Sequence, residues 1–175
     1  EFYKKHPKET LIVVTADHET GGIALGTGKY ALNLKALENQ KASAEVLSKK
    51  ISDLRKAKNN HVAWEDIKNL LSEEMGFWSV LPITWEQEKK LRDEYEKSFV
   101  RNKVEFAESM YAKTEPMAAK AKEVMDQIAM VGWTSGGHSA GYVPVFAIGA
   151  GSDLFIGKMD NTEIPKRIAK AGGYK

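Results

Sequence analysis

The chain has 175 residues, of which 42% are hydrophobic and 29% charged, a balance that predicts one globular domain with a real core. Its net charge of +2 comes from interspersed acids and bases, which argues against nucleic acid as a partner. Cysteine is absent, which excludes disulfides and thiolate metal sites, and no apolar run approaches the roughly 20 residues that span a bilayer. We therefore expect neither a nucleic-acid interface nor a membrane span.

The first seven residues are charged, carry no signal peptide and predict the tail of a helix stopped by Pro7. We expect this opening to lie inside a longer protein, so the missing signal does not indicate where that protein resides. A strand is predicted next, at residues 10–15, because Leu11 to Val14 form a continuous β-branched run too short for a helix. Such a run is typical of a strand buried on both faces, as in a parallel sheet.

Asp17 and His18 follow this strand directly, with Glu19 close behind and Gly21 and Gly22 allowing a sharp turn. In open α/β sheets, ligands bind beyond the carboxyl ends of the strands. A carboxylate and an imidazole at that place are candidate zinc ligands, since zinc takes oxygen and nitrogen donors. An aspartate that caps a turn beside a structural histidine fits the same spacing, and the pattern alone leaves both interpretations open.

A second strand is predicted at residues 22–26, and from about residue 33 to residue 128 glycine nearly vanishes while Lys, Glu and Ala dominate. Apolar spacings of three and four predict one amphipathic helix across residues 34–54 and another from residue 63 to about Gly76. A capping box at Thr84 opens a long third helix. Its predicted buried stripe is Leu91, Tyr95, Phe99, Phe106 and Met110.

A fourth helix is predicted to begin at Pro116 and run to about Ile128. We interpret the Met and aromatic stripes of these helices as core and the Lys and Glu faces as solvated surface. Sheet character returns at residues 130–134 and 143–148, with Pro144 indicating an edge position or the start of a strand. The expected domain organisation is therefore a sheet portion of an α/β core at 1–32, a helical insertion at 33–129 and the rest of the core at 130–175.

Between the two later strands lies a glycine-rich loop that carries His138. Asp17, His18 and His138 would supply three ligands, the number that a catalytic zinc generally takes from protein. Adjacent residues on an extended chain point to opposite faces, however, so Asp17 and His18 can share one ion only if the turn brings both side chains round. The spacing does not decide this.

Two stretches closely resemble signatures of the alkaline phosphatase family: TADHETGG, and WTSGGHSAGYVPVFAIGAG followed by FIGKMDNTEIPKRI. The resemblance covers about residues 8–30 and 130–170 in the family's order. It implies a partial α/β/α sandwich with a helical insertion, forming the C-terminal portion of a metal-dependent phosphomonoesterase. In that family two zinc ions and a nearby magnesium act on the substrate.

The resemblance assigns Asp17 and His18 to one zinc and His138 to the other, which replaces the single-ion arrangement with two neighbouring ions. The family's serine nucleophile, its phosphate-binding arginine, its magnesium carboxylates and its remaining zinc ligands precede the Asp-His motif, so no catalytic residue is assigned in this chain. Each ion would keep only one or two ligands here. We therefore expect the isolated chain to be inactive and to bind zinc weakly or not at all.

The resemblance further implies a homodimer and a periplasmic or secreted location for the full protein. Two other interpretations remain open from the sequence. A related phosphodiesterase, sulfatase or phosphomutase would share Asp-His pairs at strand ends, although the TGG after the pair and the DNTEI tail favour the monoesterase. Alternatively, residues 33–128 could be a non-catalytic helical interaction module with the strands as its support.

Overall fold

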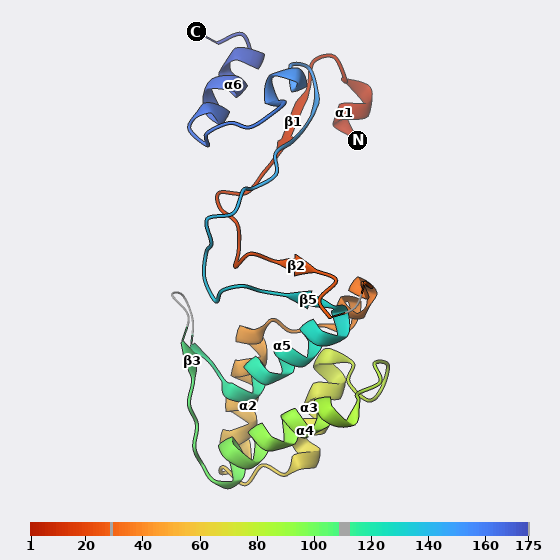
Figure 1. Ribbon diagram of the computed structural model, residues 1–175, viewed down its shortest axis with the longest axis vertical. Coiled ribbons are helices and arrows are strands. Elements are labelled where there is room, and N and C mark those ends of the chain that lie inside the picture. Colours follow the sequence, from red (N-terminus) through yellow and green to blue (C-terminus); the bar gives the residue numbers. More distant parts are fainter. Residues whose placement is uncertain (29, 109–112, 175) are drawn as a thin grey trace. The chain divides into compact units, whose positions relative to one another are not determined.

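The computed structural model describes residues 1–28, 30–108 and 113–174, and its mixture of helices and short strands agrees with the expected partial α/β class. The chain divides into two compact units (Figure 1). Unit 1 comprises residues 1–22 and 138–175, and unit 2 comprises residues 23–137. The two units are defined by which residues pack together. They do not test the domain boundaries expected from the sequence, which stay a prediction.

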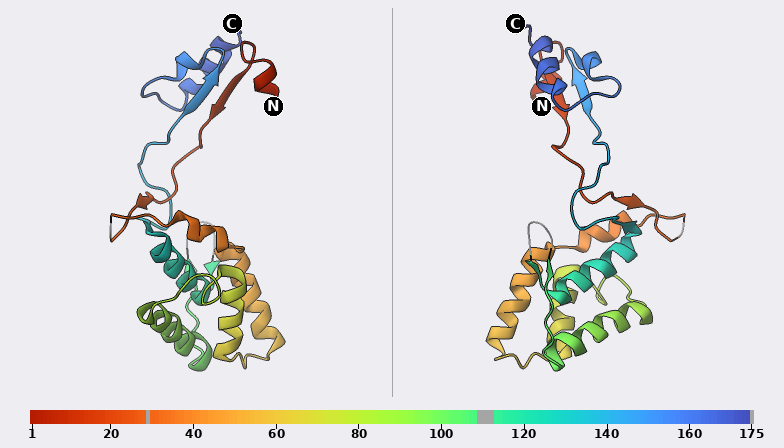
Figure 2. Two further views of the ribbon diagram at one scale, coloured as in Figure 1. Left: turned by 90° about the vertical axis from the view of Figure 1, so that its right-hand side faces the viewer. Right: turned by 60° about the vertical axis from the view of Figure 1, so that its left-hand side comes forward.

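Unit 1 is built on a two-stranded antiparallel sheet in which β1 pairs with β6, from Leu11 opposite Gly149 to Val14 opposite Phe146. The two strands run side by side in both views of Figure 2. The elements of unit 1 are α1 (Phe2–Lys5), β1 (Leu11–Val14), β6 (Phe146–Gly149), η3 (Ser152–Phe155) and α6 (Glu163–Ala171).

The expectation that β1 is buried on both faces in a parallel sheet is wrong for this chain. β1 pairs antiparallel with β6, and its burial alternates along the strand. Leu11 and Val13 face a cavity that is also lined by Ile168 of α6, while Ile12 and Val14 on the opposite face are exposed. Phe146 and Ile148 of β6 pair with Val14 and Ile12, so they extend the exposed apolar face.

Gly149 allows the chain to close this sheet. Its φ of +102° is a conformation that L side chains rarely adopt, and a Cβ built there would lie 2.0 Å from the carbonyl oxygen of Thr10. The next residue, Ala150, donates its N–H to that same oxygen at 3.0 Å. The close approach therefore requires a residue without a side chain at position 149.

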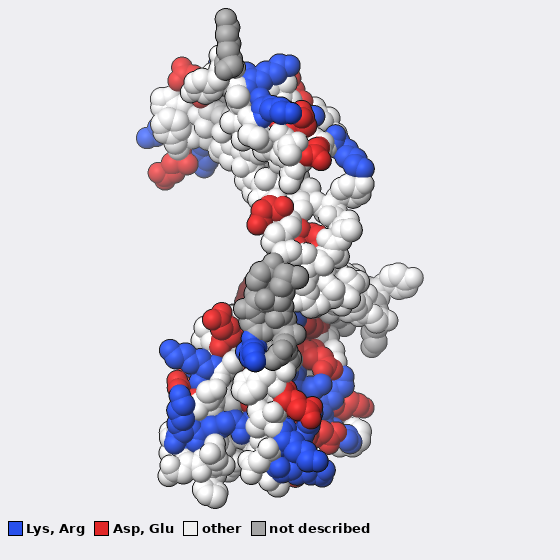
Figure 3. Space-filling model, turned by 90° about the vertical axis from the view of Figure 1, so that its left-hand side faces the viewer, with Lys and Arg blue, Asp and Glu red and all other residues white. Residues whose placement is uncertain are grey.

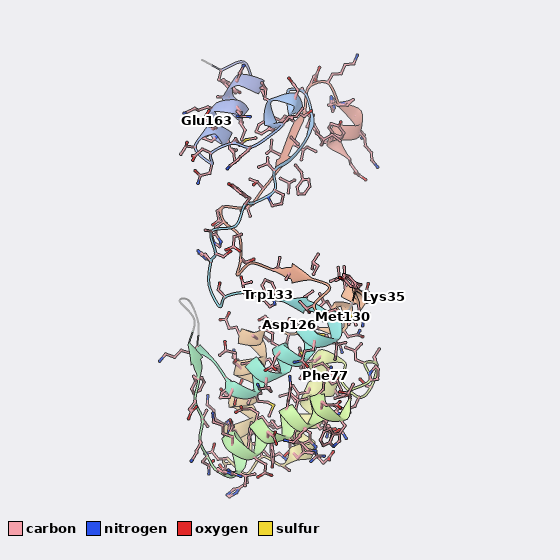
Figure 4. All side chains as sticks on the ribbon, in the orientation of Figure 1. Lys35, Phe77, Asp126, Met130, Trp133 and Glu163 are labelled. Carbon is pink, nitrogen blue, oxygen red and sulfur yellow. The ribbon has the colours of Figure 1, made fainter. Side chains whose placement is uncertain are left out.

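Unit 2 is a helical unit with two small ladders, in which β2 pairs with β5 and β3 with β4. Figure 4 shows Phe77 among its helices, where this side chain is fully buried. The elements of unit 2 are β2 (Ala24–Leu25), η1 (Leu34–Asn39), α2 (Ala44–Ala57), α3 (Trp64–Met75), α4 (Trp85–Tyr95), η2 (Glu96–Val100), β3 (Ala107–Glu108), β4 (Lys113–Thr114), α5 (Pro116–Ala129) and β5 (Val131–Gly132).

Most of the predicted core of this unit is confirmed, but Leu34 and Leu37 at the start of the predicted 34–54 helix are 44% and 36% exposed. Leu47 and Ile51 of α2, Leu91 of α4 and Met117 and Met125 of α5 are buried in one cluster. Figure 3 shows acidic and basic side chains intermixed over the surface of the helical unit. The methionine side chains of α5 therefore pack between the helices as part of the hydrophobic core.

The predicted helix across residues 34–54 is wrong in its continuity. A short 3₁₀ helix, η1, comes first, and the backbone of Gln40 is extended before α2 begins. The side chain of Ser43 accepts a hydrogen bond from the N–H of Val46 at 3.2 Å, which makes Ser43 the cap of a new helix. The spacing hid this break because Leu34 and Leu37 continue the apolar pattern of α2, although they are 44% and 36% exposed and the buried residue of η1 is Ala36.

The third predicted helix begins as expected at the capping box of Thr84 and Gln87. It ends earlier than predicted, because α4 passes into one π-helical turn, η2, that stops at Val100. Asn102 then takes a left-handed φ of +53°, which redirects the chain and leaves Phe106 48% exposed. Phe106 is thus not part of the buried stripe, and Met110 lies outside the described residues.

A buried ion pair links α2 to the start of α5. Arg55 Nη2 donates to Glu115 Oε1 at 2.8 Å, and the Glu115 side chain is only 1% exposed. Glu115 Oε2 accepts hydrogen bonds from the N–H groups of Met117 and Ala118, which caps α5. Arg55 also donates to the carbonyl of Ser98, so it satisfies two acceptors in the core.

Candidate metal centre

The turn after β1 brings the side chains of Asp17 and His18 together. Asp17 Oδ2 lies 3.6 Å from His18 Nε2, and Asp17 Oδ1 accepts a hydrogen bond from the backbone N–H of His18 at 3.1 Å. The two residues leave the strand before the turn, so the alternation of an extended backbone no longer separates them. The geometric condition that the sequence left open is therefore met.

The other ring nitrogen of His18 is held by the backbone. His18 Nδ1 lies 2.6 Å from the carbonyl oxygen of Glu19, and since a carbonyl can only accept, Nδ1 carries the proton and donates. In the neutral imidazole, Nε2 on the Asp17 side is then the nitrogen that carries the lone pair. Histidines that bind metals commonly donate the second ring nitrogen to a carbonyl in this way.

His138 comes from the loop before β6, yet its ring stacks on that of His18. The ring centroids are 3.6 Å apart and the planes differ by 27°. A further link between the two chain stretches is the hydroxyl of Thr15, which donates to the carbonyl of Pro144 at 3.2 Å. The structure thus brings together the three residues that the sequence singled out.

Glu19 is a member of this site that sequence reasoning left without a role. Its Oε2 accepts a hydrogen bond from the N–H of Gly22 at 2.6 Å, and its Oε1 accepts one from the N–H of Ser139. The side chain is half-buried between the two loops. The bond to Ser139 joins residues 120 positions apart, and no short-range sequence pattern indicates a contact of that kind.

The donor set fits zinc in its chemistry and in one distance. Two ligands about 2.1 Å from a tetrahedral ion lie about 3.4 Å apart, close to the 3.6 Å between Asp17 Oδ2 and His18 Nε2. His6 and Glu9 approach to a similar 3.7 Å, but the ring of His6 stacks on Phe2 and not on a second imidazole. Asp17 and His18 therefore fit a shared ion, with His138 as an adjacent donor.

The site is open and incomplete within this chain. The Asp17 side chain is 87% exposed and that of His18 is 40% exposed. Over residues 1–28, 30–108 and 113–174, no group of three or more His, Cys, Asp and Glu side chains is arranged to hold an ion by itself.

Among the same residues, no helix has the length and apolar character needed to cross a bilayer.

Comparison with known proteins agrees with the resemblance seen in the two motifs. Alkaline phosphatase 3 of Bacillus subtilis is 31% identical over 98% of this chain, and alkaline phosphatase 4 of the same organism is 28% identical over 97%. These matches cover 32% and 31% of the two relatives, so the chain spans about a third of their length.

A solved structure gives the same result. The crystal structure of a cold-active alkaline phosphatase from the psychrophile Shewanella sp. matches with a TM-score of 0.63 and 25% identity, over 98% of this chain and 36% of that one. The family model for alkaline phosphatase matches residues 1–174, so the match runs through the helical unit as well as the sheet unit. The chain belongs to the alkaline phosphatase family.

Proposed function

We propose that this chain forms part of the active site of a zinc-dependent phosphomonoesterase. Asp17 and His18 bind one zinc ion, and His138 binds a second ion beside it. As the family resemblance implies, the serine nucleophile, the magnesium ligands and the remaining zinc ligands lie outside this chain, which spans about a third of the length of its relatives. The substrate of the full protein is a phosphate monoester, and its assembly is a homodimer outside the cytoplasm, as the family resemblance implies.

The observation that carries the proposal is the geometry around His18. Its Nε2 faces Asp17 Oδ2 at 3.6 Å, while its Nδ1 is held by the Glu19 carbonyl. One ring nitrogen is therefore fixed as a donor and the other is presented beside a carboxylate. A histidine that served only packing would not need its tautomer and its ring direction both set by neighbours.

The stacking of His18 and His138 supports two neighbouring ions over one shared ion. An ion bound by imidazole lies near the plane of the ring, and these two rings are stacked with centroids 3.6 Å apart and planes that differ by 27°. Zinc ions held by Asp17, His18 and His138 would supply Lewis-acid stabilisation of the negative charge on a phosphate ester. The chain's own contribution is to hold the imidazoles of His18 and His138 with their centroids 3.6 Å apart.

The two rival interpretations receive less support. The family match favours the monoesterase over a phosphodiesterase, a sulfatase or a phosphomutase, since the named relatives are alkaline phosphatases. The match also includes the helical unit, so nothing singles out that unit as an unrelated interaction module. Its role in assembly stays a prediction.

Two measurements on the purified chain test the proposal. A competition titration with a chromophoric chelator should detect weak zinc binding that falls about tenfold or more in Asp17→Ala and His18→Ala. The matched control is His61→Ala, at an exposed histidine in unit 2, which should bind zinc as the parent chain does. Zinc binding that survives both changes at the site would contradict the proposal.

The second measurement is hydrolysis of a chromogenic phosphate ester with zinc and magnesium supplied. We expect no turnover, because the chain presents too few ligands to hold both ions firmly. Turnover by the purified chain would contradict the division of the active site between this portion and the rest of the family domain.

A further inference from the structure

We infer that Glu19 is the positioning residue that holds the His18 loop and the His138 loop together, so that the two imidazoles keep their spacing. The inference rests on the proposed function, since it concerns the same candidate ligands. It adds a residue that neither binds the ions nor touches the substrate.

The side chain of Glu19 contacts both loops at once. Oε2 accepts from the N–H of Gly22 at 2.6 Å, which closes a turn over residues 19–22 directly after His18. Oε1 accepts from the N–H of Ser139, the residue next to His138. Hydrogen bonds from amides to a carboxylate are about twice as strong as those between neutral groups. One carboxylate therefore fixes two loops that are far apart in the sequence.

The backbone of Glu19 acts on the same site. Its carbonyl oxygen holds His18 Nδ1 at 2.6 Å and so sets the direction of the ring. The main chain of one residue thus orients the first imidazole while its side chain places the loop of the second. Movement of Glu19 would change both the orientation of His18 and the position of His138.

Gly141 provides the space that this arrangement needs. A Cβ built at Gly141 would lie 3.2 Å from Glu19 Cγ and 3.4 Å from Ser139 Oγ, so an added methyl group would press on the bridging side chain. By contrast, a Cβ at Gly136 would meet nothing within 4 Å. Neither glycine has a positive φ, so alanine is compatible with the backbone at both positions.

The first test compares Glu19→Ala and Glu19→Gln with the parent chain, all without metal. Nuclear Overhauser contacts between the ring protons of His18 and His138 report the stacking, and amide hydrogen exchange reports the bonds to Gly22 and Ser139. In Glu19→Ala we expect loss of the ring contacts and about tenfold faster exchange at both amides. Glu19→Gln keeps one acceptor oxygen, so it should retain part of the protection.

The control is Glu163→Ala, which removes an exposed carboxylate of unit 1 that pairs with Lys166 across one turn of α6. It should leave the ring contacts and both amides as in the parent chain. Amides of β1 and β6 in unit 1 serve as an internal reference, because protection there shows that the unit carrying the site remains folded.

A second pair of variants leaves the carboxylate in place. Gly141→Ala should weaken the ring contacts and speed exchange at Ser139, because the added methyl displaces Glu19, whereas Gly136→Ala should change neither. If Glu19→Ala keeps the ring contacts and the slow exchange at Gly22 and Ser139, the inference is overturned.

Zinc titration separates this inference from the proposed function. If Glu19→Ala loses the ring contacts and binds zinc about tenfold more weakly than the parent chain, Glu19 positions the ligands as inferred. If the ring contacts are lost but zinc affinity is unchanged, the positioning role is overturned while the assignment of the ligands stands. If His18→Ala leaves the affinity of the parent chain unchanged, the proposed function itself fails.

Discussion

Asp17 Oδ2 and His18 Nε2 lie 3.6 Å apart in the turn after β1, although the two residues are neighbours in the chain. A shared ion requires this convergence, and an extended backbone would prevent it. Within this bend Asp17 Oδ1 accepts a hydrogen bond from the N–H of His18 at 3.1 Å, and directly after it Glu19 accepts one from the N–H of Gly22. The local fold of unit 1 is therefore what gives these two residues their candidate role.

The stability of the helical unit should depend strongly on the buried pair of Arg55 and Glu115. Glu115→Ala leaves the guanidinium without its carboxylate and removes the acceptor for two N–H groups at the start of α5. We expect a loss of about 3–5 kcal/mol in the free energy of unfolding of unit 2, measured in urea. The control Glu105→Ala removes a carboxylate that is 73% exposed, and its unfolding midpoint should stay close to that of the parent chain.

Acid should weaken the start of α3. The N–H of Ala63 and the ammonium of Lys58 hold the pKa of Asp66 below its ordinary value. A carboxyl with a lowered pKa in the folded state contributes stability above its unfolded pKa of about 3.9, and this contribution disappears as pH falls through the folded value. Asp66→Ala should therefore cost about 1 kcal/mol near neutral pH and progressively less below about pH 4.

Urea unfolding of both proteins between pH 7 and pH 3 measures this difference. If the difference in the free energy of unfolding between Asp66→Ala and the parent chain stays constant from pH 7 to pH 3, the assignment of a charged Asp66 to the helix start is contradicted.

Gly149→Ala should disrupt the closure of unit 1. The new Cβ would collide with the carbonyl oxygen of Thr10, so we expect a loss of more than about 2 kcal/mol, read as faster amide exchange in β1 and β6. Gly157 also has a positive φ, +86°, but a Cβ there meets nothing within 4 Å. Gly157→Ala should therefore cost only about 1 kcal/mol of backbone strain. Equal effects of the two substitutions would show that the close approach to Thr10 is unimportant.

The exposed apolar face of the β1–β6 sheet should bind hydrophobic dyes. Val14 is 57% exposed and its cross-strand partner Phe146 is 65% exposed, and a two-stranded sheet with one open apolar face is unusual in an isolated domain. Val14→Thr with Phe146→Thr should lower the fluorescence of bound anilinonaphthalene sulfonate by roughly half. Val46→Thr, at an exposed valine on α2, should leave the signal unchanged.

The sequence predicted those features that local chemistry decides. The capping box at Thr84, Pro116 at the start of α5 and the Met and Leu stripes of the core follow from spacing and side-chain type, and the structure confirms them. The break at Ser43 was missed because Leu34 and Leu37 continue the apolar spacing of α2 although they lie on the surface. The exposed position of Phe106 was missed because it follows from the backbone turn at Asn102.

In the candidate site, too, local sequence predicts some residues, whereas others can be assigned only from the folded chain. Asp17, His18 and His138 could be selected from their residue types and loops, and the resemblance divided them between two ions. Glu19 could not be assigned, because its bond to Ser139 exists only once two distant loops have met. The burial of β1 was also overestimated. Its continuous apolar run predicts a strand that is buried on both faces, but the residues of this chain pack against only one of them.

The most direct test of the central claim is a zinc titration of the metal-free chain followed by the ring-proton signals of its histidines. The account predicts that the signals of His18 and His138 move together as zinc is added, even if binding is weak, while those of His61 stay in place. If the rings of His18 and His138 do not respond to millimolar zinc, or respond no more than His61, the assignment of these residues as zinc ligands is contradicted.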